Sequence, residues 1–462
     1  MQKENEEKEV VKRMNYTKLA NLVLPNVRQT TDDYESMYPE RKLPKGAEVT
    51  RIAPSPTGLI HLGVLFSALA DERIAHQSGG TFYLRIEDTD QKRKVEGAVD
   101  AILKALDYFH IPLDEGADVQ KQNLYGPYYQ RERAKIYQSY AKLLIQKGLA
   151  YPCFCTEEEL SKIRNQQMAE HEMTGYHAKY AKCRELTLEE VQAKIEAKLP
   201  YVIRLKSQGS LGGSVTIDDA LKGEIRLPAN VQDIVLLKTD GIPTYHFAHA
   251  IDDHLMHTTL VLRGEEWLSS VPIHIELFDA LGFTLPRYAH TSQLMKMDGN
   301  SKRKLSKRKD PECSLEYYRK DGYHPNSIKL YLMTLLNSNF EQWYLKHPEK
   351  TIEDFPFDVS KMSQAGALFD LEKLHNICKN EFANMTVDEV YEFLYQWSLE
   401  YLPEKISIYF EDAIYMKKVL ALCMGVEEKR KRKDFIYARQ ILDHIHYFFE
   451  ASILPKDTLR FD

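Results

Sequence analysis

The sequence lacks several features that would place it in particular classes of protein. Its six cysteines are unevenly spaced, so they do not form the disulfide framework of a small secreted domain. No apolar run reaches the length of a membrane span, and the first residues are charged rather than apolar. We therefore expect neither a transmembrane segment nor a signal peptide, but a cytoplasmic protein without a membrane partner.

Two common nucleotide-binding motifs are also absent. The chain contains neither a Gly-x-Gly-x-x-Gly run nor a Walker loop, which argues against a dinucleotide-binding or a P-loop enzyme. The formal net charge is only −6, so any nucleic acid would have to be bound by local basic patches. With 462 residues, the chain is long enough for several domains with separate cores.

Strand and helix patterns alternate in the first third of the chain. Strands are predicted at Val49–Ala53 and Thr81–Ile86, and helices at Leu65–Gln77, Val95–Phe109 and Gln130–Gln146. Such alternation predicts a parallel, doubly wound sheet that binds its ligands at the carboxyl ends of the strands.

This pattern is interrupted and later resumes. From about Ala150 to Leu237 the sequence pattern changes to that of short strands and helices with a glycine-rich turn, which predicts an α+β insertion. The strand pattern returns at Asp233–Lys238, Thr244–His249 and Thr259–Arg263. After Pro311 the sequence is persistently helical, with helices predicted at 315–320, 327–336, 368–377, 387–397, 413–424 and 435–449. The predicted fold is α/β: a Rossmann-type doubly wound domain split by the insertion and followed by an all-α C-terminal region.

Two short segments carry the strongest functional signal. The first, Arg51-Ile-Ala-Pro-Ser-Pro-Thr-Gly-Leu-Ile-His61-Leu-Gly63, places a Pro/Gly turn between a strand and a helix. A helix N-terminus has amides without intrahelical partners and a partial positive charge, so it suits a phosphate chain. The second, Lys304-Leu-Ser-Lys-Arg308, supplies the cations that a triphosphate needs. Either segment alone would be weaker, because Pro/Gly turns are common and Lys/Arg runs also serve as solvated faces or targeting patches.

Together the two segments resemble the His-Ile-Gly-His and Lys-Met-Ser-Lys-Ser signatures of class I aminoacyl-tRNA synthetases. The Pro-Ser-Pro-Thr-Gly lead-in is the form found in the glutamyl/glutaminyl branch, and the runs Arg85–Asp90, Asp240–His249 and Val261–Trp267 are similar to that branch as well. The whole pattern resembles bacterial glutamyl-tRNA synthetases. One departure is Val64, which stands where the first signature has its second histidine, so only His61 can serve from that motif.

The resemblance implies ATP-dependent ligation of L-glutamate to the 3′ end of glutamate tRNA through a glutamyl adenylate, with release of AMP and pyrophosphate. ATP and Mg²⁺ are the implied cofactors, and a monomer is expected. Two alternatives stay open: an enzyme that also charges glutamine tRNA, and a glutaminyl-tRNA synthetase. The second builds its anticodon region from β-barrels, whereas residues 315–450 are predicted to be helical.

The resemblance also implies roles for individual residues. Arg51 would clamp the side-chain carboxylate of the substrate, which a bidentate guanidinium does better than an ammonium. The other expected glutamate-binding residues are Ala53, Ser55, Glu87, Tyr245, His249 and Arg263. The expected ATP-binding residues are Ser55, His61, Gly63, Glu266, Trp267, Lys304, Ser306, Lys307 and Arg308, and among them His61, Lys304 and Lys307 are expected to be catalytic.

Cys153-Phe-Cys155 and the later Cys183 admit two interpretations. Closely spaced thiolates favour Zn²⁺, and some members of the resembling family bind zinc here with a further Tyr or His. Tyr180 is then the expected fourth ligand, with His177 as the alternative. The other interpretation is that the three cysteines are plain buried thiols.

The predicted domain boundaries combine the patterns above with the resemblance. Because family members usually continue through a longer helical anticodon domain, a truncated last region and a complete one both stay open as interpretations. The predicted domains are an N-terminal extension (1–46), the first half of the catalytic Rossmann domain (47–149), an acceptor-binding insertion (150–236), the second half of the catalytic domain (237–311), a helical stem-contact region (312–385) and a helical anticodon-binding region (386–462).

Overall fold

The structure is a computed structural model in which the chain forms two compact units. The described residues are 14–58, 60–93, 95–119, 124–306, 308–364, 366–426 and 431–449. Unit 1 consists of the described parts of Met1–Gly58, Ile74–Glu96 and Leu113–Thr291, and unit 2 of those of Leu59–Arg73, Gly97–Pro112 and Ser292–Asp462.

Parallel strands form the centre of unit 1. The amide of Thr259 donates to the carbonyl of Val49 over 3.0 Å and so places β9 beside β1. The order along the sheet is therefore β3-β2-β1-β9-β10, and the direction of winding changes between β1 and β9, where a doubly wound fold binds its ligands. The strands are β1 (Val49–Ile52), β2 (Thr81–Leu84), β3 (Glu115–Gly116), β9 (Leu260–Gly264) and β10 (Arg287–Thr291).

Part of the segment predicted as an insertion joins this sheet. The antiparallel hairpin β6 (Ser214–Asp219) and β7 (Gly223–Pro228) extends the sheet, because Asp219 pairs with Tyr288 of β10. A separate antiparallel sheet contains β4 (Ala150–Cys153), β5 (Val202–Leu205) and β8 (Val235–Leu237).

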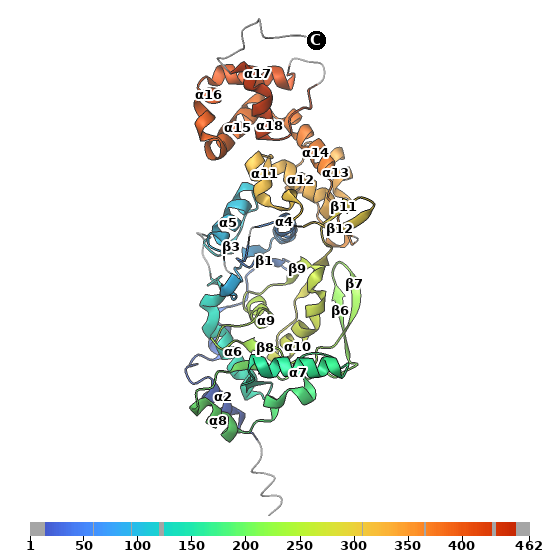
Figure 1. The fold of residues 1–462 in the computed structure, drawn as a ribbon. Helices are drawn as coiled ribbons and strands as arrows, with labels where there is room; N and C mark the ends of the chain where they lie inside the picture. Colours follow the sequence, from blue (N-terminus) through green and yellow to red (C-terminus); the bar gives the residue numbers. More distant parts are fainter. Residues whose placement is uncertain are drawn as a thin grey trace, which may run out of the picture. The chain divides into compact units, whose positions relative to one another are not determined.

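Helices α6, α9 and α10 of unit 1 pack against one another (Figure 1). Sequence-local signals define several helix ends: the capping boxes Thr156–Glu159 and Thr187–Glu190 begin α7 and α8, because each pair satisfies two backbone amides. The helices of this unit include α2 (Tyr16–Val23), α3 (Thr31–Met37), α6 (Ala134–Gln146), α7 (Glu157–Ala169), α8 (Leu188–Glu196), α9 (Tyr245–Leu255) and α10 (Val271–Leu281).

The predicted strand Thr244–His249 is wrong, because helix α9 begins at Tyr245. Phe247, Ile251 and Leu255 are all buried and recur every four residues, which is the spacing of one helix face. The short window ending at His249 concealed this period. The correction from a strand to a helix matters for function, because side chains four residues apart along α9 lie on the same side of the helix.

Unit 2 is mainly helical and also carries the hairpin β11 (Met295–Asp298) and β12 (Ser301–Lys304), which the sequence reading did not predict. Helix α4 (Leu62–Gln77) begins in this unit, and α5 (Ala98–Tyr108) belongs to it. Within the described residues after Pro311, the predicted all-α region is confirmed. It contains α11 (Leu315–Asp321), α12 (Pro325–Leu336), α13 (Phe340–Lys346), α14 (Leu371–Asn384), α15 (Val387–Tyr401), α16 (Ile406–Phe410), α17 (Ala413–Met424) and α18 (Ala438–Ile445).

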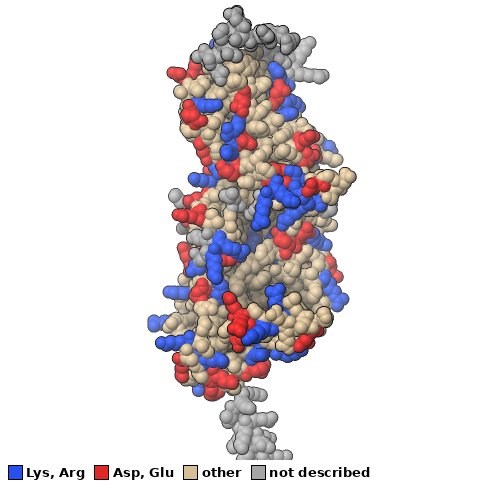
Figure 2. Space-filling view, in the orientation of Figure 1, with Lys and Arg blue, Asp and Glu red and all other residues tan. Residues whose placement is uncertain are grey.

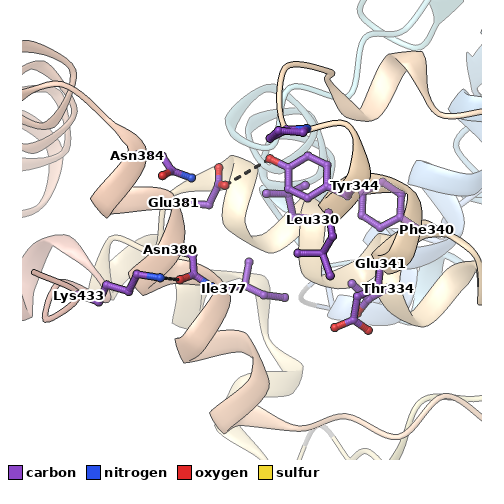
Figure 3. A pocket seen from close by; sticks show the side chains of 12 residues that line it. Leu330, Thr334, Phe340, Glu341, Tyr344, Ile377, Asn380, Glu381, Asn384 and Lys433 are labelled. Atoms are coloured by element: carbon purple, nitrogen blue, oxygen red, sulfur yellow. Dashed lines mark hydrogen bonds between the residues drawn. The ribbon is translucent and has the colours of Figure 1, made fainter. Parts of the chain in front are cut away.

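A pocket of about 370 Å³ opens beside α12, α13 and α14 (Figure 3). The carboxylate of Glu381 accepts hydrogen bonds there from Asn326 (2.7 Å) and from the Tyr344 hydroxyl (3.4 Å), and burial raises the pKa of Glu381. None of the predicted ligand-binding residues lines this pocket. Among the helices that the structure describes, none combines the length and the apolar character that a bilayer span requires.

Candidate active site

Three arginines lie at the carboxyl ends of neighbouring strands in unit 1. Arg51 stands in β1, Arg85 directly follows β2, and Arg263 stands in β9. Arg51 and Arg263 are 5% and 7% exposed, and Arg85 is fully buried. A buried guanidinium is stable only when carboxylates or other acceptors surround it, so the partners of these arginines define the site.

Asp253 of α9 is the shared partner of two of these arginines. Its Oδ1 lies 2.5 Å from Nη1 of Arg85 and 3.4 Å from Nε of Arg51. Although burial acts in the opposite direction, Arg51 and Arg85 hold the pKa of Asp253 well below its usual range. Asp253 is therefore an ionised, fully buried anchor that α9 presents to the ends of β1 and β2.

Arg263 is held by three other elements. Its Nε donates to Nε2 of His290 on β10 over 3.0 Å. Its Nη1 lies 3.4 Å from the hydroxyl of Tyr245 on α9 and 3.3 Å from Nδ1 of His274 on α10. The ring of Tyr288 lies 4.7 Å from the guanidinium carbon, within the range of a cation–π contact.

Glu87 completes a mixed-charge pocket at the same strand ends. Its carboxylate is buried and accepts from Nη2 of Arg85 over 3.2 Å, and its amide donates to the carbonyl of Pro54 in the turn after β1. Burial, followed by the charge of Glu87, raises the pKa of Tyr245, whereas Arg263 and Arg51 act in the opposite direction. We call Arg51, Glu87, Tyr245 and Arg263 the arginine pocket.

The other residues of unit 1 that the sequence predicts to bind ligands differ in how exposed they are. Ala53 and Ser55 continue from β1, with Ala53 half-buried and Ser55 exposed. Glu266 and Trp267 are exposed in the short helix η5 (Glu265–Ser270) after β9, and the ring of Trp267 lies 4.5 Å from that of Tyr245.

His249, for which the sequence predicted a substrate contact, stacks against Tyr245, with ring centroids 5.9 Å apart. Its ring is fully buried, with Nε2 2.9 Å from the hydroxyl of Tyr288 and Nδ1 2.8 Å from Oδ2 of Asp253. Burial lowers its pKa to about 4. His249 thus supports the arginine pocket from behind, and both ring nitrogens already lie against protein partners.

In unit 2, His61 forms the start of helix α4. Its carbonyl accepts from the amides of Val64 (2.8 Å) and Leu65 (3.4 Å), which places it at the N-cap. A Cβ atom on residue 63 would lie 3.1 Å from two atoms of the His61 ring, so Gly63 leaves room for the imidazole over the first turn. The helix that the sequence predicted after the Pro/Gly turn is therefore present and begins directly after His61.

Residues 304–308, which we call the cation loop, follow β12 in unit 2. Lys304 and Arg308 are exposed, Ser306 is half-buried, and Lys307 lies outside the described residues. Figure 2 shows Lys and Arg side chains gathered over the part of unit 2 that carries the β11–β12 hairpin.

One buried carboxylate shapes this loop. Asp310 receives two hydrogen bonds from the guanidinium of Arg303 (2.6 and 2.8 Å) and one from the amide of Ser306 (2.8 Å). The bonds from Arg303 lower the pKa of Asp310. The side chain of Arg303 therefore stabilises the loop itself, whereas the side chains of Lys304 and Arg308 are exposed to solvent.

Comparison with known proteins agrees with this arrangement. The family of tRNA synthetases class I (E and Q), catalytic domain, matches residues 48–376. The glutamate–tRNA ligases of Acetivibrio thermocellus and Clostridium perfringens are 54% and 47% identical over 96% of this chain and 81% of their own lengths. The crystal structure of a glutamate tRNA ligase from Elizabethkingia meningosepticum in complex with its amino acid has a TM-score of 0.72 and 31% identity, covering 88% of this chain and 81% of that one.

The chain belongs to the class I tRNA synthetases of the glutamyl and glutaminyl branch. The α/β fold predicted from the sequence, with its Rossmann-type catalytic domain, is confirmed by this membership and by the sheet order. The glutaminyl alternative is not favoured, since the relatives named above are glutamate–tRNA ligases.

The synthetase also brings three thiols together in unit 1. The Sγ atoms of Cys153, Cys155 and Cys183 all lie within 4.8 Å of one another, and those of Cys155 and Cys183 are 3.7 Å apart. The hydroxyl of Tyr176 lies 3.3 Å from Sγ of Cys155. A tetrahedral zinc ion separates its sulfur ligands by about 3.8 Å, given a Zn–S bond of about 2.3 Å, so this set fits zinc.

The predicted fourth ligand of this zinc site, Tyr180, has other partners in the structure. The hydroxyl of Tyr180 lies 3.0 Å from both Glu170 and Glu172 and so points to a different set of partners. The alternative, His177, directs Nε2 to the carbonyl of Met173. The structure instead places Tyr176 beside the thiols, because the chain folds back between Cys155 and Cys183.

Sequence reasoning missed the residues that hold the synthetase's arginines. Asp253 lies four residues after His249, so a helical reading of this segment would have found it. Asp219 and His290 carry no local signal, because each becomes relevant only through the pairing of β6 with β10. The same applies to Tyr176, which no motif marks.

Proposed function

We propose that this chain activates L-glutamate with ATP and then transfers the glutamyl group to the terminal ribose of glutamate tRNA. The chain ligates glutamate to tRNA, as its relatives' names and its family indicate. In the first step a carboxylate oxygen of glutamate bonds to the α-phosphorus, and the bond to pyrophosphate breaks. In the second, a ribose hydroxyl bonds to the acyl carbon, and AMP leaves as the hydroxyl proton is lost.

The observation that carries this proposal is the arginine pocket. Two buried guanidiniums, Arg51 and Arg263, have their Nε edges against protein acceptors. A guanidinium binds a carboxylate through two parallel hydrogen bonds, which fix its orientation. Glu87 supplies one buried negative charge for the ammonium group of the substrate, and Ala53 and Ser55 bind the α-groups. A glutamate side chain thus matches the pocket in charge.

The residues that we assign to the nucleotide belong mainly to the two sequence motifs. His61, Gly63 and the first turn of α4 bind phosphate oxygens, together with Lys304, Ser306, Lys307 and Arg308. Preorganised positive charge of this kind stabilises the negative charge of the displaced pyrophosphate. Glu266 and Trp267 bind the rest of the nucleotide. Mg²⁺, when bound to the ATP, neutralises part of its phosphate charge.

The remaining regions bind tRNA. We assign residues 150–236 to the acceptor end, 312–385 to the stem and 386–462 to the anticodon. The enzyme acts as a cytoplasmic monomer. Its tRNA contacts come from local basic groups, in keeping with a net charge of only −6.

The direct test is charging of purified glutamate tRNA and glutamine tRNA with radiolabelled glutamate, ATP and Mg²⁺. Charging of glutamate tRNA alone is the expected result, and charging of both would show that the enzyme does not discriminate between them. Lys307→Ala should lower the rate of pyrophosphate exchange by about 100-fold, in line with the loss of one preorganised charge. Failure to charge either tRNA would contradict the proposal.

Cys153, Cys155, Cys183 and Tyr176 would hold zinc, which would fix the segment between β4 and η4 (Lys182–Glu185) as a structural cross-link. Metal analysis of the purified enzyme should give one zinc per chain. Cys155→Ser should release zinc and lower the melting temperature. Tyr176→Phe should weaken zinc retention against a chelator, and Tyr180→Phe, the matched control, should leave it unchanged. Equal retention by both Tyr variants would exclude Tyr176 as a ligand.

A further inference from the structure

Asp219 of the β6–β7 hairpin is linked to Arg263 of the arginine pocket through His290. Asp219 ends β6 and is only 1% exposed. Its Oδ1 accepts from the amides of Leu221 (3.0 Å) and Lys222 (2.9 Å), which turns the chain into β7. Its Oδ2 lies 2.6 Å from Nδ1 of His290 on β10. The same carboxylate therefore shapes the hairpin turn and binds an imidazole of the central sheet.

The hydrogen-bond pattern determines which nitrogen of His290 carries its proton. Burial acts against it, but the bonds from His290 and from the turn amides lower the pKa of Asp219, so this carboxylate is ionised and can only accept. Nδ1 of His290 must then carry the hydrogen, and Nε2 has a free lone pair. That lone pair accepts from Nε of Arg263 over 3.0 Å.

The environment keeps the imidazole neutral, as this pattern requires. Burial lowers the pKa of His290, and the positive charge of Arg263 acts in the same direction, although Asp219 opposes both. A protonated ring would have no acceptor for Arg263. The hydrogen bonds therefore donate in one direction: the Arg263 guanidinium donates to the neutral imidazole of His290, and this imidazole donates to the carboxylate of Asp219.

We infer that Asp219 and His290 are positioning residues, which orient the Arg263 guanidinium to receive the side-chain carboxylate of glutamate. This inference rests on the proposed function of Arg263. Holding Nε fixes the plane of the guanidinium, whose Nη1 lies 3.4 Å from the Tyr245 hydroxyl of the arginine pocket, and the orientation of a bidentate group decides how well it binds a carboxylate. The same turn also bonds Nζ of Lys222 to Glu265 over 2.8 Å, next to the predicted ATP-binding pair Glu266 and Trp267.

Two variants of His290 separate positioning from mere packing. Gln places an oxygen near the former Nε2 and preserves an acceptor for Arg263, whereas Asn is shorter and cannot reach it. We expect His290→Asn to raise the KM for glutamate about tenfold, the effect of losing one buried hydrogen bond, with the KM for ATP unchanged. His290→Gln should recover most of this loss.

Asp219→Asn should act through the imidazole. The Asn amide donates to Nδ1, which moves the ring proton to Nε2, where it opposes the Nε–H of Arg263. The KM for glutamate should again rise about tenfold. Asp218→Asn is the matched control, because Asp218 is the neighbouring carboxylate on β6 and is exposed, and it should leave both KM values unchanged.

The measurements are steady-state tRNA charging at varied glutamate and at varied ATP, with thermal unfolding of each variant. Equal KM values for glutamate in His290→Asn and His290→Gln would overturn the inference, as would parallel increases in both KM values. Should Asp219→Asn fail to fold, the comparison at position 290 still decides. An unchanged KM for glutamate in Arg263→Lys would instead contradict the proposed function itself.

Discussion

The arginine pocket of unit 1 and the cation loop of unit 2 hold positive charge in opposite ways. Arg51 and Arg263 are buried, and the Nε of each contacts a residue distant in the sequence, Asp253 and His290 respectively. Lys304 and Arg308 are exposed on a loop that is anchored by the nearby Asp310. The charges of the arginine pocket are thus fixed in position before a ligand binds, whereas those of the cation loop are exposed to water.

This difference matches the two ligands that we propose. A single carboxylate has to be distinguished from similar groups, and a buried guanidinium of fixed orientation does this because it has already lost its water. A polyphosphate must be bound and then released as pyrophosphate, and exposed lysines in water attract it without holding it strongly. Burial therefore supplies selectivity in unit 1, whereas exposure permits release in unit 2.

The largest effect should come from removing a charge that is fully buried. Arg85→Met leaves Asp253 and Glu87 without their shared cation, and breaking a buried ion pair costs about 3–5 kcal/mol of unfolding free energy. Urea unfolding measures this loss. The control Arg164→Met, at an exposed position on α7, should change the unfolding free energy by less than about 0.5 kcal/mol. Equal losses would remove the distinction between buried and exposed charge.

Arg263→Lys tests selectivity within the pocket. An ammonium cannot donate to His290 and to a carboxylate in the fixed, planar arrangement of a guanidinium. We expect kcat/KM for glutamate to fall on the order of 100-fold, measured by tRNA charging at low glutamate. Arg287→Lys, at an exposed position on β10, is the matched control. A variant with wild-type kcat/KM would show that the guanidinium's shape is unimportant.

The contrast between local and distant contacts also explains what the sequence could predict. Arg51, His61 and the cation loop belong to short motifs, so neighbouring residues alone identified them. Asp219 and His290 are 71 residues apart, and Arg51 and Asp253 are 202 apart. No local pattern records such pairs, because strand pairing and helix packing create them.

The fold shows the same limit at the level of elements. The parallel strands were predicted because their residues are buried on both faces and read as apolar runs. Thr244–His249 was read as a strand, since a window ending at His249 is too short to reveal the helical period of Tyr245–Leu255. Tyr180 and His177 were considered as zinc ligands, and Tyr176 was not, because spacing along the chain does not record how a loop folds back.

Acidification should weaken the arginine pocket through its histidines. Burial lowers the pKa of His246 and His249 to about 4, whereas an unfolded histidine titrates near 6.5. Between these values the unfolded chain binds more protons, so stability is complete above about pH 6.5 and falls as the pH is lowered. Each histidine should contribute about 1.4 kcal/mol per pH unit in that window.

Urea unfolding at pH 7, 6 and 5 measures this slope. His246→Gln should reduce it by one histidine's share, and the exposed His171→Asn should leave it unchanged. Because His324 of unit 2 is likewise shifted to about 4 by burial, part of the slope should remain in His246→Gln. A slope that does not change in His246→Gln would show that His246 does not couple folding to pH.

The smallest effect should come from the exposed side of the comparison. Lys304→Ala removes one cation that has no fixed partner geometry to maintain, so we expect the KM for ATP to rise about tenfold with no change in unfolding free energy. The matched control is Lys302→Ala, because Lys302 is also exposed on β12 but lies outside the cation loop.

Salt dependence gives a second test of this comparison, because the attraction of an exposed charge is screened within about 8–10 Å at 0.1–0.15 M ionic strength. Raising the salt concentration should therefore bring the wild-type KM for ATP closer to that of Lys304→Ala, while the KM for glutamate, which depends on buried charges, should change less. Equal salt dependence of the two KM values would mean that burial does not separate the two regions.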